Sequence, residues 1–323
     1  MNFYEQLQQI LKPEQIFKEE PMKNHTTFRI GGPADWFVTP STKEEIHKLV
    51  DLAASELLPV SFIGNGSNLL VGDLGIRGLV IQIGRGFSKI ELEGEILYAE
   101  AGASLARIAG QAYEAGLTGF EFAAGIPGTL GGAVTMNAGA YGGEMKDVLT
   151  EVEVLTPSGE RKVLPADRLN LSYRYSIIPE EGWIVLGARI RLSKGDKVDI
   201  KAKMEEYSLA RRTKQPLEFP SAGSTFKRPE GFFAGKLIQD SGLKGASVGD
   251  AKVSTKHSGF VINEGQASAR DVQSLIYQVQ QKVYEDSGEN KIMLNPEVKM
   301  IGEFLPLEPM EPMILARKVR IEE

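Results

Sequence analysis

The sequence predicts an α+β protein built from two or three domains. Strand-like and helix-like segments interleave irregularly along the chain, which favours an α+β architecture over a regular doubly wound sheet. The length of 323 residues is more than one compact core usually holds. Hydrophobic residues make up 42% of the chain and charged residues 25%, which is the ordinary balance of a folded globular protein.

The helices are predicted from capping signals and from apolar residues at helical spacing. Ser41 and Glu44 match a capping box, and apolar residues follow them at intervals of three and four. Ser104 is expected to cap a second helix that stops at Gly116. In the run Val272–Val283, apolar residues fall at i, i+3, i+4, i+7 and i+11, which indicates a strongly amphipathic helix packed in the core.

Short apolar runs between turn residues predict the strands. These runs are residues 59–64, 78–84, 96–101, 151–156, 184–192 and 259–263. The polar stretch 211–220 is expected to be a domain junction. The last residues, 305–323, contain three prolines and are expected to form a peripheral tail.

Composition excludes several kinds of function. The 37 basic and 43 acidic residues give a net charge of -6, which argues against a nucleic-acid-binding protein. The chain has no cysteine, so a disulfide framework, a thiolate nucleophile, an iron–sulfur cluster and a cysteine zinc site are ruled out. Its three histidines, His25, His47 and His257, lie far apart in sequence without ligand spacing, so we expect no metal site.

We expect neither a targeting sequence nor a membrane-spanning segment. The N-terminus carries acidic residues early and lacks the basic and apolar regions of a signal peptide. The uncharged stretch 122–143 has the length of a membrane span, but its seven glycines, with proline, threonine and asparagine, make it too polar and too broken. The expected location is therefore the cytoplasm, without membrane insertion.

Two glycine-rich loops are the strongest candidates for a ligand site. The first, Gly64–Asn68, follows a predicted strand, and its glycines would let successive N–H groups approach one anion; an ordinary turn between strands is the alternative. The second, Gly125–Gly143, has the spacing G-x-x-G-x-x-G-G, which is neither a Rossmann fingerprint nor a P-loop. Its uncharged, backbone-rich surface suits a diphosphate and a flat ring. A packed glycine–alanine turn region would carry a large entropic cost without a ligand.

Six motifs, in order, resemble those of the UDP-N-acetylenolpyruvoylglucosamine reductase family. They are NHTTFRIGG (24–32), GNGSN (64–68), GIPGTLGG (125–132), YR (173–174), AGSTFK (222–227) and NPEVK (295–299). The resemblance covers about residues 20–304. The short distance between Arg174 and Lys214 leaves no room for the tyrosine-bearing loop of one branch, so the chain is similar to the shorter, second type of the family.

The resemblance implies an α+β, FAD-binding fold of the vanillyl-alcohol-oxidase type, with two α+β subdomains, plus an α+β substrate-binding domain. The expected ranges are 1–83 for the first FAD-binding subdomain, completed by about 295–304, then 84–205 for the second, 206–294 for the substrate-binding domain and 305–323 for the tail. FAD is expected to be non-covalent, with NADPH as co-substrate. The residues expected to contact FAD are Gly64, Asn65, Gly66, Ser67, Asn68, Pro127, Gly128, Thr129, Gly131, Gly132, Ala133 and Asn137.

The resemblance also implies which residues act on the UDP-sugar substrate. Arg174, Ser224 and Glu297 take the catalytic places, with Ser224 as the proton donor. The residues expected to bind the substrate are Tyr173, Arg211, Lys214, Gly223, Arg228 and His257, with Arg211 and Lys214 near its diphosphate. His257 stands where many members carry glutamine, and Arg228 stands where some carry asparagine.

The implied reaction is the NADPH-dependent reduction of UDP-N-acetylglucosamine-enolpyruvate to UDP-N-acetylmuramate, a step of peptidoglycan precursor synthesis. Hydride comes from N5 of reduced FAD, Arg174 stabilises the charge that develops on the substrate, and Ser224 supplies the proton. Glu297 protonates the substrate's carboxylate or orients the serine. Taken singly, these residues would be a surface cation, a turn residue and a strand-end carboxylate.

Two alternatives stay open at this point. One is another FAD-dependent oxidase or dehydrogenase of the same fold, although many of those tether FAD through histidine or cysteine, and neither glycine-rich loop contains one. The other is a nucleotide-sugar-binding protein without redox activity, which would need the loops and the cations but not Ser224 and Glu297 together. No obligatory protein partner is expected.

Overall fold

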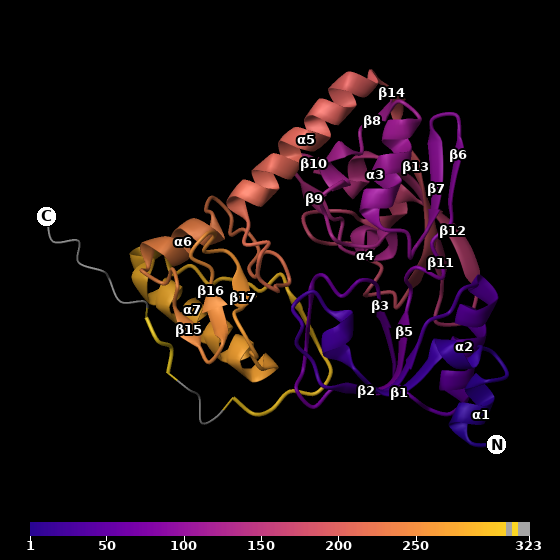
Figure 1. The fold of residues 1–323 in the computed structure, drawn as a ribbon, viewed down its shortest axis with the longest axis horizontal. Coiled ribbons are helices and arrows are strands. Elements are labelled where there is room, and N and C mark those ends of the chain that lie inside the picture. Colours follow the sequence, from indigo (N-terminus) through magenta and orange to yellow (C-terminus); the bar gives the residue numbers. More distant parts are fainter. Residues whose placement is uncertain (308–311, 316–323) are drawn as a thin grey trace, which may run out of the picture. The chain divides into compact units, whose positions relative to one another are not determined.

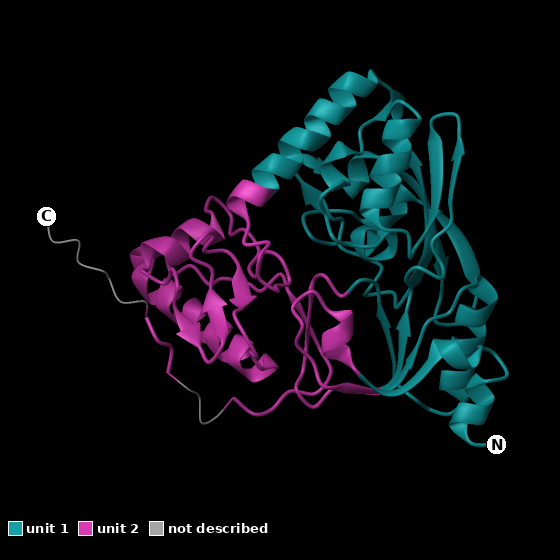
Figure 2. Cartoon of the chain, viewed as in Figure 1, with its two compact units in different colours: residues 1–20, 35–65, 78–211 teal, residues 21–34, 66–77, 212–323 magenta. Residues whose placement is uncertain are grey.

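The computed structural model describes residues 1–307 and 312–315, which form two compact units (Figure 2). Unit 1 comprises residues 1–20, 35–65 and 78–211, and unit 2 comprises 21–34, 66–77 and the described residues from 212 onward. The chain passes between the units after residues 20, 34, 65, 77 and 211, so neither unit is a continuous stretch of sequence. The ranges expected above for the FAD-binding subdomains and the substrate-binding domain are defined by the ligands they would bind. They stay predictions.

A four-stranded sheet in the order β1-β2-β5-β3 lies almost wholly in unit 1 (Figure 1). Its strands are β1 (Ile16–Pro21), β2 (Pro33–Val38), β3 (Val60–Ile63) and β5 (Ile76–Gln82), and the helices nearby in sequence are α1 (Phe3–Leu7) and α2 (Lys43–Ser55). β3 and β5 pair in parallel, with Val60 opposite Leu79. α2 buries its apolar face, so the helix expected after residue 41 is present.

The start of α2 differs from the predicted one by a single residue. The N-cap is Thr42, whose side chain accepts a hydrogen bond from the Glu45 N–H at 3.1 Å. The Glu45 carboxylate accepts from the Ser41 N–H at 2.6 Å. The predicted Ser41–Glu44 capping box is therefore wrong, because Thr42 and Glu45 repeat the same pattern one position later and take the capping roles.

The second large sheet of unit 1 has five antiparallel strands, in the order β12-β11-β13-β7-β6. Its strands are β6 (Ile90–Glu93), β7 (Ile96–Glu100), β11 (Leu149–Leu155), β12 (Arg161–Pro165) and β13 (Ile184–Arg191), and α3 (Leu105–Glu114) and α4 (Leu130–Thr135) belong to the same unit. One cluster of buried hydrophobic residues includes both sheets together with α2, α3 and α4, so unit 1 has a single core.

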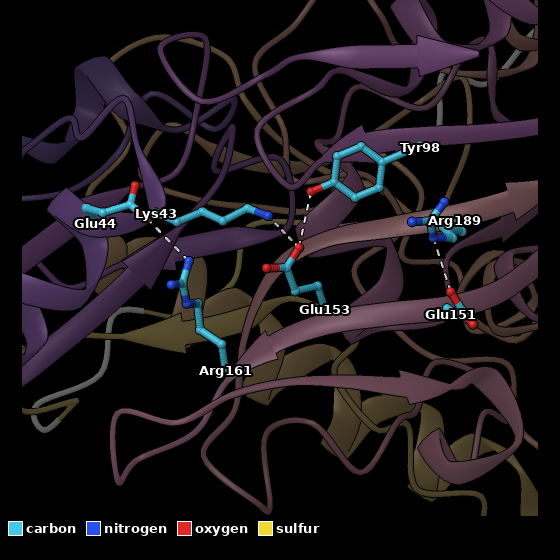
Figure 3. A network of polar contacts seen from close by, with 7 residues as sticks. All are labelled: Lys43, Glu44, Tyr98, Glu151, Glu153, Arg161 and Arg189. Atoms are coloured by element: carbon cyan, nitrogen blue, oxygen red, sulfur yellow. Dashed lines mark hydrogen bonds and ion pairs between the residues drawn. The ribbon is translucent and has the colours of Figure 1, made fainter. Parts of the chain in front are cut away.

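A polar network joins α2 to this sheet (Figure 3). Lys43 of α2 forms an ion pair of 2.6 Å with Glu153 of β11, and the Tyr98 hydroxyl of β7 donates to the same carboxylate at 3.2 Å. Two ion pairs flank it: Arg161–Glu44 at 3.3 Å and Arg189–Glu151 at 3.1 Å. Because the Lys43 and Glu153 side chains are largely buried, this pair is less screened than a surface salt bridge.

The remaining regular elements of unit 1 are short, apart from one long polar helix whose last three residues belong to unit 2. They are β8 (Leu117–Thr118), β9 (Gly139–Ala140), β10 (Gly143–Glu144) and β14 (Ser193–Lys194), with 3-10 turns at Pro13–Gln15, Glu121–Ala123, Met145–Asp147 and Ala166–Leu169. The long helix is α5 (Lys197–Lys214), in which only Ile200 is fully buried. The polar stretch expected as a junction, 211–220, begins as the last turn of this helix.

Unit 2 is built on a three-stranded antiparallel sheet, in the order β15-β16-β17. Its elements are β15 (Ser247–Val248), β16 (Ala251–Val253), β17 (Val261–Asn263), α6 (Ala234–Asp240), α7 (Ala269–Asp286), and 3-10 turns at Met22–His25 and Gly288–Asn290. β4 (Leu69–Val71) pairs in parallel with β18 (Lys299–Ile301). A second core cluster combines the α7 face with Phe28, Ile30 and Leu70 from the two early segments of the unit.

The elements expected from periodicity are confirmed. Each predicted strand is present as β3, β5, β7, β11, β13 or β17, and the predicted helices are α2, α3 and α7. Ser104 caps α3 by accepting from the Arg107 N–H at 3.3 Å, and Gly116 ends it with φ 67°. α4 was not predicted, because two of its six residues are glycines, which favour helices poorly.

The predicted tail, 305–323, lies partly outside the described residues. In its described part, Ile314 exchanges two backbone hydrogen bonds with Ser247, of 2.9 and 2.7 Å. The Met313 N–H donates to the Gln278 side chain at 2.8 Å. Residues 312–315 therefore lie along the edge of the unit 2 sheet at β15.

Candidate active site

The two glycine-rich loops contact each other within unit 1. β3 ends at Ile63, and a Cβ added to Gly64 would lie only 2.3 Å from Thr129 Oγ1. Asn65 Nδ2 donates to the Pro127 carbonyl at 3.4 Å. Glycine at residue 64 lets the loops approach this closely, because the Cβ of a larger residue would meet the Thr129 side chain.

The second loop is held on one side and offers main-chain donors on the other. The Gly131 N–H donates to the Ala101 carbonyl at 2.8 Å, which fixes the loop next to β7. Among the described residues, no acceptor pairs with the N–H of Gly128, Thr129 or Gly132. Gly132 is exposed, and the nearest atom to an added Cβ would be Thr129 Oγ1 at 3.8 Å. Uncharged donors in an open glycine surface fit the diphosphate of FAD.

The last three residues of the first loop belong to unit 2. Gly66 has φ 60°, and a Cβ there would lie 2.1 Å from the His25 carbonyl oxygen. Asn68 Nδ2 donates to the Glu297 carbonyl at 3.1 Å, and the Lys299 N–H donates to the Asn68 carbonyl at 2.9 Å. The Asn68 side chain thus binds the main chain of a predicted catalytic residue.

Arg174 occupies a strained position in a tight turn of unit 1. Ser172 and Tyr175 exchange two backbone hydrogen bonds of 3.1 Å, and Arg174 between them has φ 54°, in the left-handed region. Its Nη2 donates to the Gly139 carbonyl at 3.1 Å, and its guanidinium carbon lies 5.1 Å from the centre of the Tyr173 ring. A non-glycine residue keeps such a conformation only where its surroundings impose it.

Ser224 and Glu297 are linked in unit 2 through the backbone of Thr225. Gly223 has φ 79° with open space around it, and the turn exposes Ser224. The next residue, Thr225, is buried: its N–H donates to the Gly259 carbonyl, and its carbonyl accepts from the Glu297 N–H, both at 2.8 Å. Glu297 is 9% exposed. The exposed serine is therefore held next to a fixed antiparallel pairing that contains the buried glutamate.

Arg211, near the C-terminal end of α5, lies against the second glycine-rich loop. Its Cδ is 3.3 Å from the position of a Cβ on Gly125, and burial lowers the pKa of its guanidinium, opposed by Tyr141. The Tyr141 ring stacks on Tyr207 of α5, with centroids 4.5 Å apart and an interplanar angle of 7°. Tyr207 and Arg211 are four residues apart on the helix, so they face the loop together.

The other predicted substrate residues lie in unit 2. Burial lowers the pKa of His257, whose Nδ1 accepts from the Gly259 N–H at 3.1 Å. The Arg228 guanidinium lies 4.3 Å from the centre of the exposed Phe233 ring. Lys214 is exposed at the end of α5.

The predicted site residues are thus divided between the units. Unit 1 holds Gly64, Asn65, Pro127, Gly128, Thr129, Gly131, Gly132, Ala133, Asn137, Tyr173, Arg174 and Arg211, and unit 2 holds Gly66, Ser67, Asn68, Lys214, Gly223, Ser224, Arg228, His257 and Glu297. Ala133 is buried in the unit 1 core, and Asn137 is buried with its side chain fully hydrogen-bonded within the protein.

Sequence reasoning missed three side chains next to the predicted residues. They are Tyr141 and Tyr207, which stack, and Glu144, whose carboxylate hydrogen-bonds Asn137. The only signal for Tyr141 was its place inside the glycine-rich segment, and α5 has too little apolar periodicity to indicate which of its faces is covered.

In the described part of the chain, no helix combines the length and apolar character needed to cross a bilayer. No group of three or more histidine, aspartate or glutamate side chains there is arranged to bind a metal ion.

Two protein-family models match this chain, one in its N-terminal half and one in its C-terminal part. Residues 34–164 match the family model for an FAD binding domain, and residues 215–301 match the model for the C-terminal domain of UDP-N-acetylenolpyruvoylglucosamine reductase. The α+β, FAD-binding fold expected from the sequence is therefore confirmed.

Individual relatives match over nearly their whole lengths. The UDP-N-acetylenolpyruvoylglucosamine reductase of Agathobacter rectalis is 58% identical over 301 residues, which cover 90% of this chain and 95% of the relative. That of Caldanaerobacter subterraneus subsp. tengcongensis is 52% identical, covering 93% and 98%. The crystal structure of UDP-N-acetylenolpyruvylglucosamine reductase from Thermus caldophilus superposes with a TM-score of 0.75 at 39% identity, covering 87% of this chain and 97% of that one. The chain belongs to the UDP-N-acetylenolpyruvoylglucosamine reductase family.

Proposed function

We propose that this protein is an FAD-containing, NADPH-dependent oxidoreductase that reduces the C=C bond of UDP-N-acetylglucosamine-enolpyruvate to give UDP-N-acetylmuramate for peptidoglycan synthesis. Family membership supports the substrate class. The observation that carries the proposal is the exposed Ser224 at a glycine turn, held next to the backbone pairing of buried Glu297. We place the reaction in the cytoplasm, where UDP-sugars and NADPH are made.

The glycine-rich loops are the proposed holders of FAD, through the uncharged N–H groups of residues 128, 129 and 132. When bound, FAD supplies hydride-transfer chemistry. The absence of cysteine, and of histidine from both loops, supports non-covalent binding.

Arg174 is proposed to pair with the substrate's carboxylate. Negative charge develops on the carbon next to this carboxylate when hydride adds to the enol ether, and a guanidinium stabilises it there most strongly in a site that excludes water. A planar guanidinium also fits a carboxylate through two parallel hydrogen bonds, which fixes the orientation of the substrate.

Ser224 is proposed to donate its hydroxyl proton to this carbon. A serine is a weak acid, but a carbanion is basic enough to accept its proton, and the small side chain can approach carbon closely. Glu297 is proposed to orient the serine or to protonate the substrate's carboxylate. Arg211 and Lys214 are proposed to bind the diphosphate of the UDP-sugar, and Tyr173, Gly223, Arg228 and His257 complete the proposed substrate site.

The test of this function follows the visible flavin spectrum of the purified protein in two stages. NADPH should bleach the bound flavin, and the enolpyruvyl UDP-sugar should restore its colour with formation of UDP-N-acetylmuramate. In Ser224→Ala, bleaching by NADPH should keep its wild-type rate, whereas reoxidation by the substrate should slow about 10²-fold or more, the usual contribution of a general acid. The two rates are measured by stopped-flow absorbance.

Three results would contradict the proposal in different ways. A chain that refuses FAD supplied in excess is not a flavoenzyme. Flavin that stays attached after denaturation and filtration would favour a covalent oxidase of the same fold. Equal loss of both rates in Ser224→Ala would show that the serine is not the proton donor.

A further inference from the structure

Both side-chain N–H groups and the side-chain oxygen of Asn137 are hydrogen-bonded within unit 1. Asn137 is fully buried, with φ 43°. Its Nδ2 donates to Glu144 Oε2 and to the Ser172 carbonyl, each at 2.9 Å, and its Oδ1 accepts from the Lys146 N–H at 2.9 Å. A primary amide has two donor hydrogens, and both are used here, so the side chain has no donor left for a flavin.

The Ser172 carbonyl belongs to the turn that carries Arg174. Ser172 begins this turn, and its carbonyl accepts both from the Tyr175 N–H and from Asn137. The Arg174 guanidinium is attached to the same segment, because it donates to the Gly139 carbonyl. The turn is therefore fastened to residues 137–139 at two points, one on its backbone and one on the side chain of Arg174.

Glu144 supplies the negative charge of this cluster. It pairs with Gly139 across the β9–β10 hairpin, where a Cβ on Gly139 would lie 2.7 Å from Glu144 Cγ. The hydrogen bond from the side-chain ammonium of Lys146 does most to lower the pKa of Glu144. Burial opposes this shift, while the hydrogen bond from Asn137 and the charge of Arg174 lower the pKa further. Glu144 is therefore an ionised carboxylate that attracts both cations.

We propose that Asn137 and Glu144 are positioning residues for Arg174, holding its left-handed turn so that the guanidinium meets the substrate's carboxylate. The inference rests on the role proposed for Arg174 above. A displacement of about 1 Å in a catalytic group can cost about 10²-fold in rate, so a turn fastened at two points has a direct catalytic value. Asn137 then serves the step that uses the substrate, and its side chain does not donate to the flavin.

The first variant is Asn137→Asp, which keeps the shape and the acceptor for Lys146 but replaces both donors with an oxygen facing Glu144 and the Ser172 carbonyl. We expect reoxidation of the NADPH-reduced flavin by the enolpyruvyl UDP-sugar to slow at least tenfold. Flavin reduction by NADPH should stay within about twofold of wild type. Unchanged reoxidation would overturn the proposal.

The milder variant Glu144→Gln retains an acceptor for Asn137 and removes the carboxylate charge, which acts on Arg174 and also forms an ion pair of 2.9 Å with Lys146. It should slow the same step at least about threefold, and it tests the proposal even if Asn137→Asp does not accumulate as folded protein. The double variant N137D/E144Q exchanges donor and acceptor, so the bond between residues 137 and 144 returns while the Ser172 carbonyl still lacks its donor. Its Tm should recover in part, with reoxidation still slow; recovery of rate in step with Tm would mean a structural role only.

Gln15 offers a matched control in the same unit. Its buried amide donates to the Thr39 carbonyl at 2.8 Å, accepts from the Lys12 N–H at 3.0 Å, and lies 3.4 Å from the Glu45 carboxylate. Gln15→Glu should lower Tm and leave reoxidation unchanged. Slow reoxidation in this control as well would mean that any loss of stability has the same effect, and the positioning role would be wrong.

Arg174→Ala separates failure of this inference from failure of the proposed function. If Arg174→Ala itself reoxidises at the wild-type rate, the catalytic role of Arg174 is wrong, and the positioning role falls with it. If Arg174→Ala is slow while Asn137→Asp is fast, only the positioning role is wrong.

Discussion

Three residues around the β9–β10 hairpin, Asn137, Tyr141 and Arg174, take the left-handed backbone conformation. For a residue such as tyrosine or arginine, this conformation costs about 1–2 kcal/mol relative to an ordinary backbone conformation. For asparagine the cost is smaller. The hydrogen bonds of Asn137, the Tyr141–Tyr207 stack and the bond from Arg174 to Gly139 are the contacts that hold them there. Strain of this kind gathers at functional sites, which agrees with the role proposed for Arg174.

Sequence motifs predict the residues proposed to carry chemistry but not the residues that hold them. Ser224 is one of these proposed residues, and its prediction rests on a short motif in which it follows a glycine. The contact between Tyr141 and Tyr207 joins residues far apart in sequence, and only the folded chain brings them together. The structural role of Asn137 could not be predicted either, since its partners at 144 and 172 are set by a hairpin and a turn with no strong local signal.

His257 gives a prediction about stability and pH. Burial lowers its pKa in the folded protein, so folding favours the neutral ring. This contribution is fully present above the ordinary histidine pKa of about 6.5 and is lost as the pH falls through the folded value. The fall in Tm between pH 7.5 and 5.5, measured with FAD in excess, should therefore be smaller in His257→Gln than in the wild type.

If His257→Gln falls as steeply as the wild type, His257 does not contribute to the pH dependence of stability.

At the scale of elements, hydrophobic periodicity was sufficient to predict a helix or strand where one of its faces is buried. α7 and α3 were found because their buried residues repeat at helical spacing. α5 has only one fully buried residue in 18, so no pattern marks its covered face. The start of α2 was misplaced because two overlapping capping patterns compete, and only the fold selects between them. The network of Lys43, Glu153 and Tyr98 then ties this helix to the sheet (Figure 3).

The short helix α4 allows a test of where FAD lies. An added Cβ on Gly132 has room within the protein, and alanine favours a helix over glycine by about 1 kcal/mol. Gly132→Ala should therefore leave the Tm of the FAD-free protein equal or higher, while FAD affinity falls because the methyl group occupies the side of the loop proposed to face FAD. Tm is measured by calorimetry and affinity by fluorescence titration. Unchanged affinity would place the flavin elsewhere.

At the scale of the whole molecule, the chain is interleaved between its two units. Residues 21–34 and 66–77 belong to unit 2, although unit 1 sequence surrounds them. Phe28, Ile30 and Leu70 from these segments are buried in the second core. Neither periodicity nor motif spacing indicates this exchange, because each segment looks locally like a loop or strand of the unit that surrounds it.

A fragment of residues 1–211 should consequently fail to fold cooperatively. It would carry the two early segments of unit 2 without α7 and β18, leaving Phe28, Ile30 and Leu70 exposed to solvent. We expect strong binding of a hydrophobic dye and a broad thermal transition, in contrast to the intact chain. A sharp transition without dye binding would show that the fragment is an independent domain.

The parallel pairing of β4 with β18 has a consequence for biosynthesis. Leu69–Val71 leaves the ribosome well before its partner Lys299–Ile301 is made, because the 227 residues 72–298 lie between the two strands. At about 5–20 residues per second, the early strand waits on the order of ten seconds or more for this partner. During that interval it is a natural client for chaperones, and slow codons or a stalled ribosome between the two strands would prolong its exposure to aggregation.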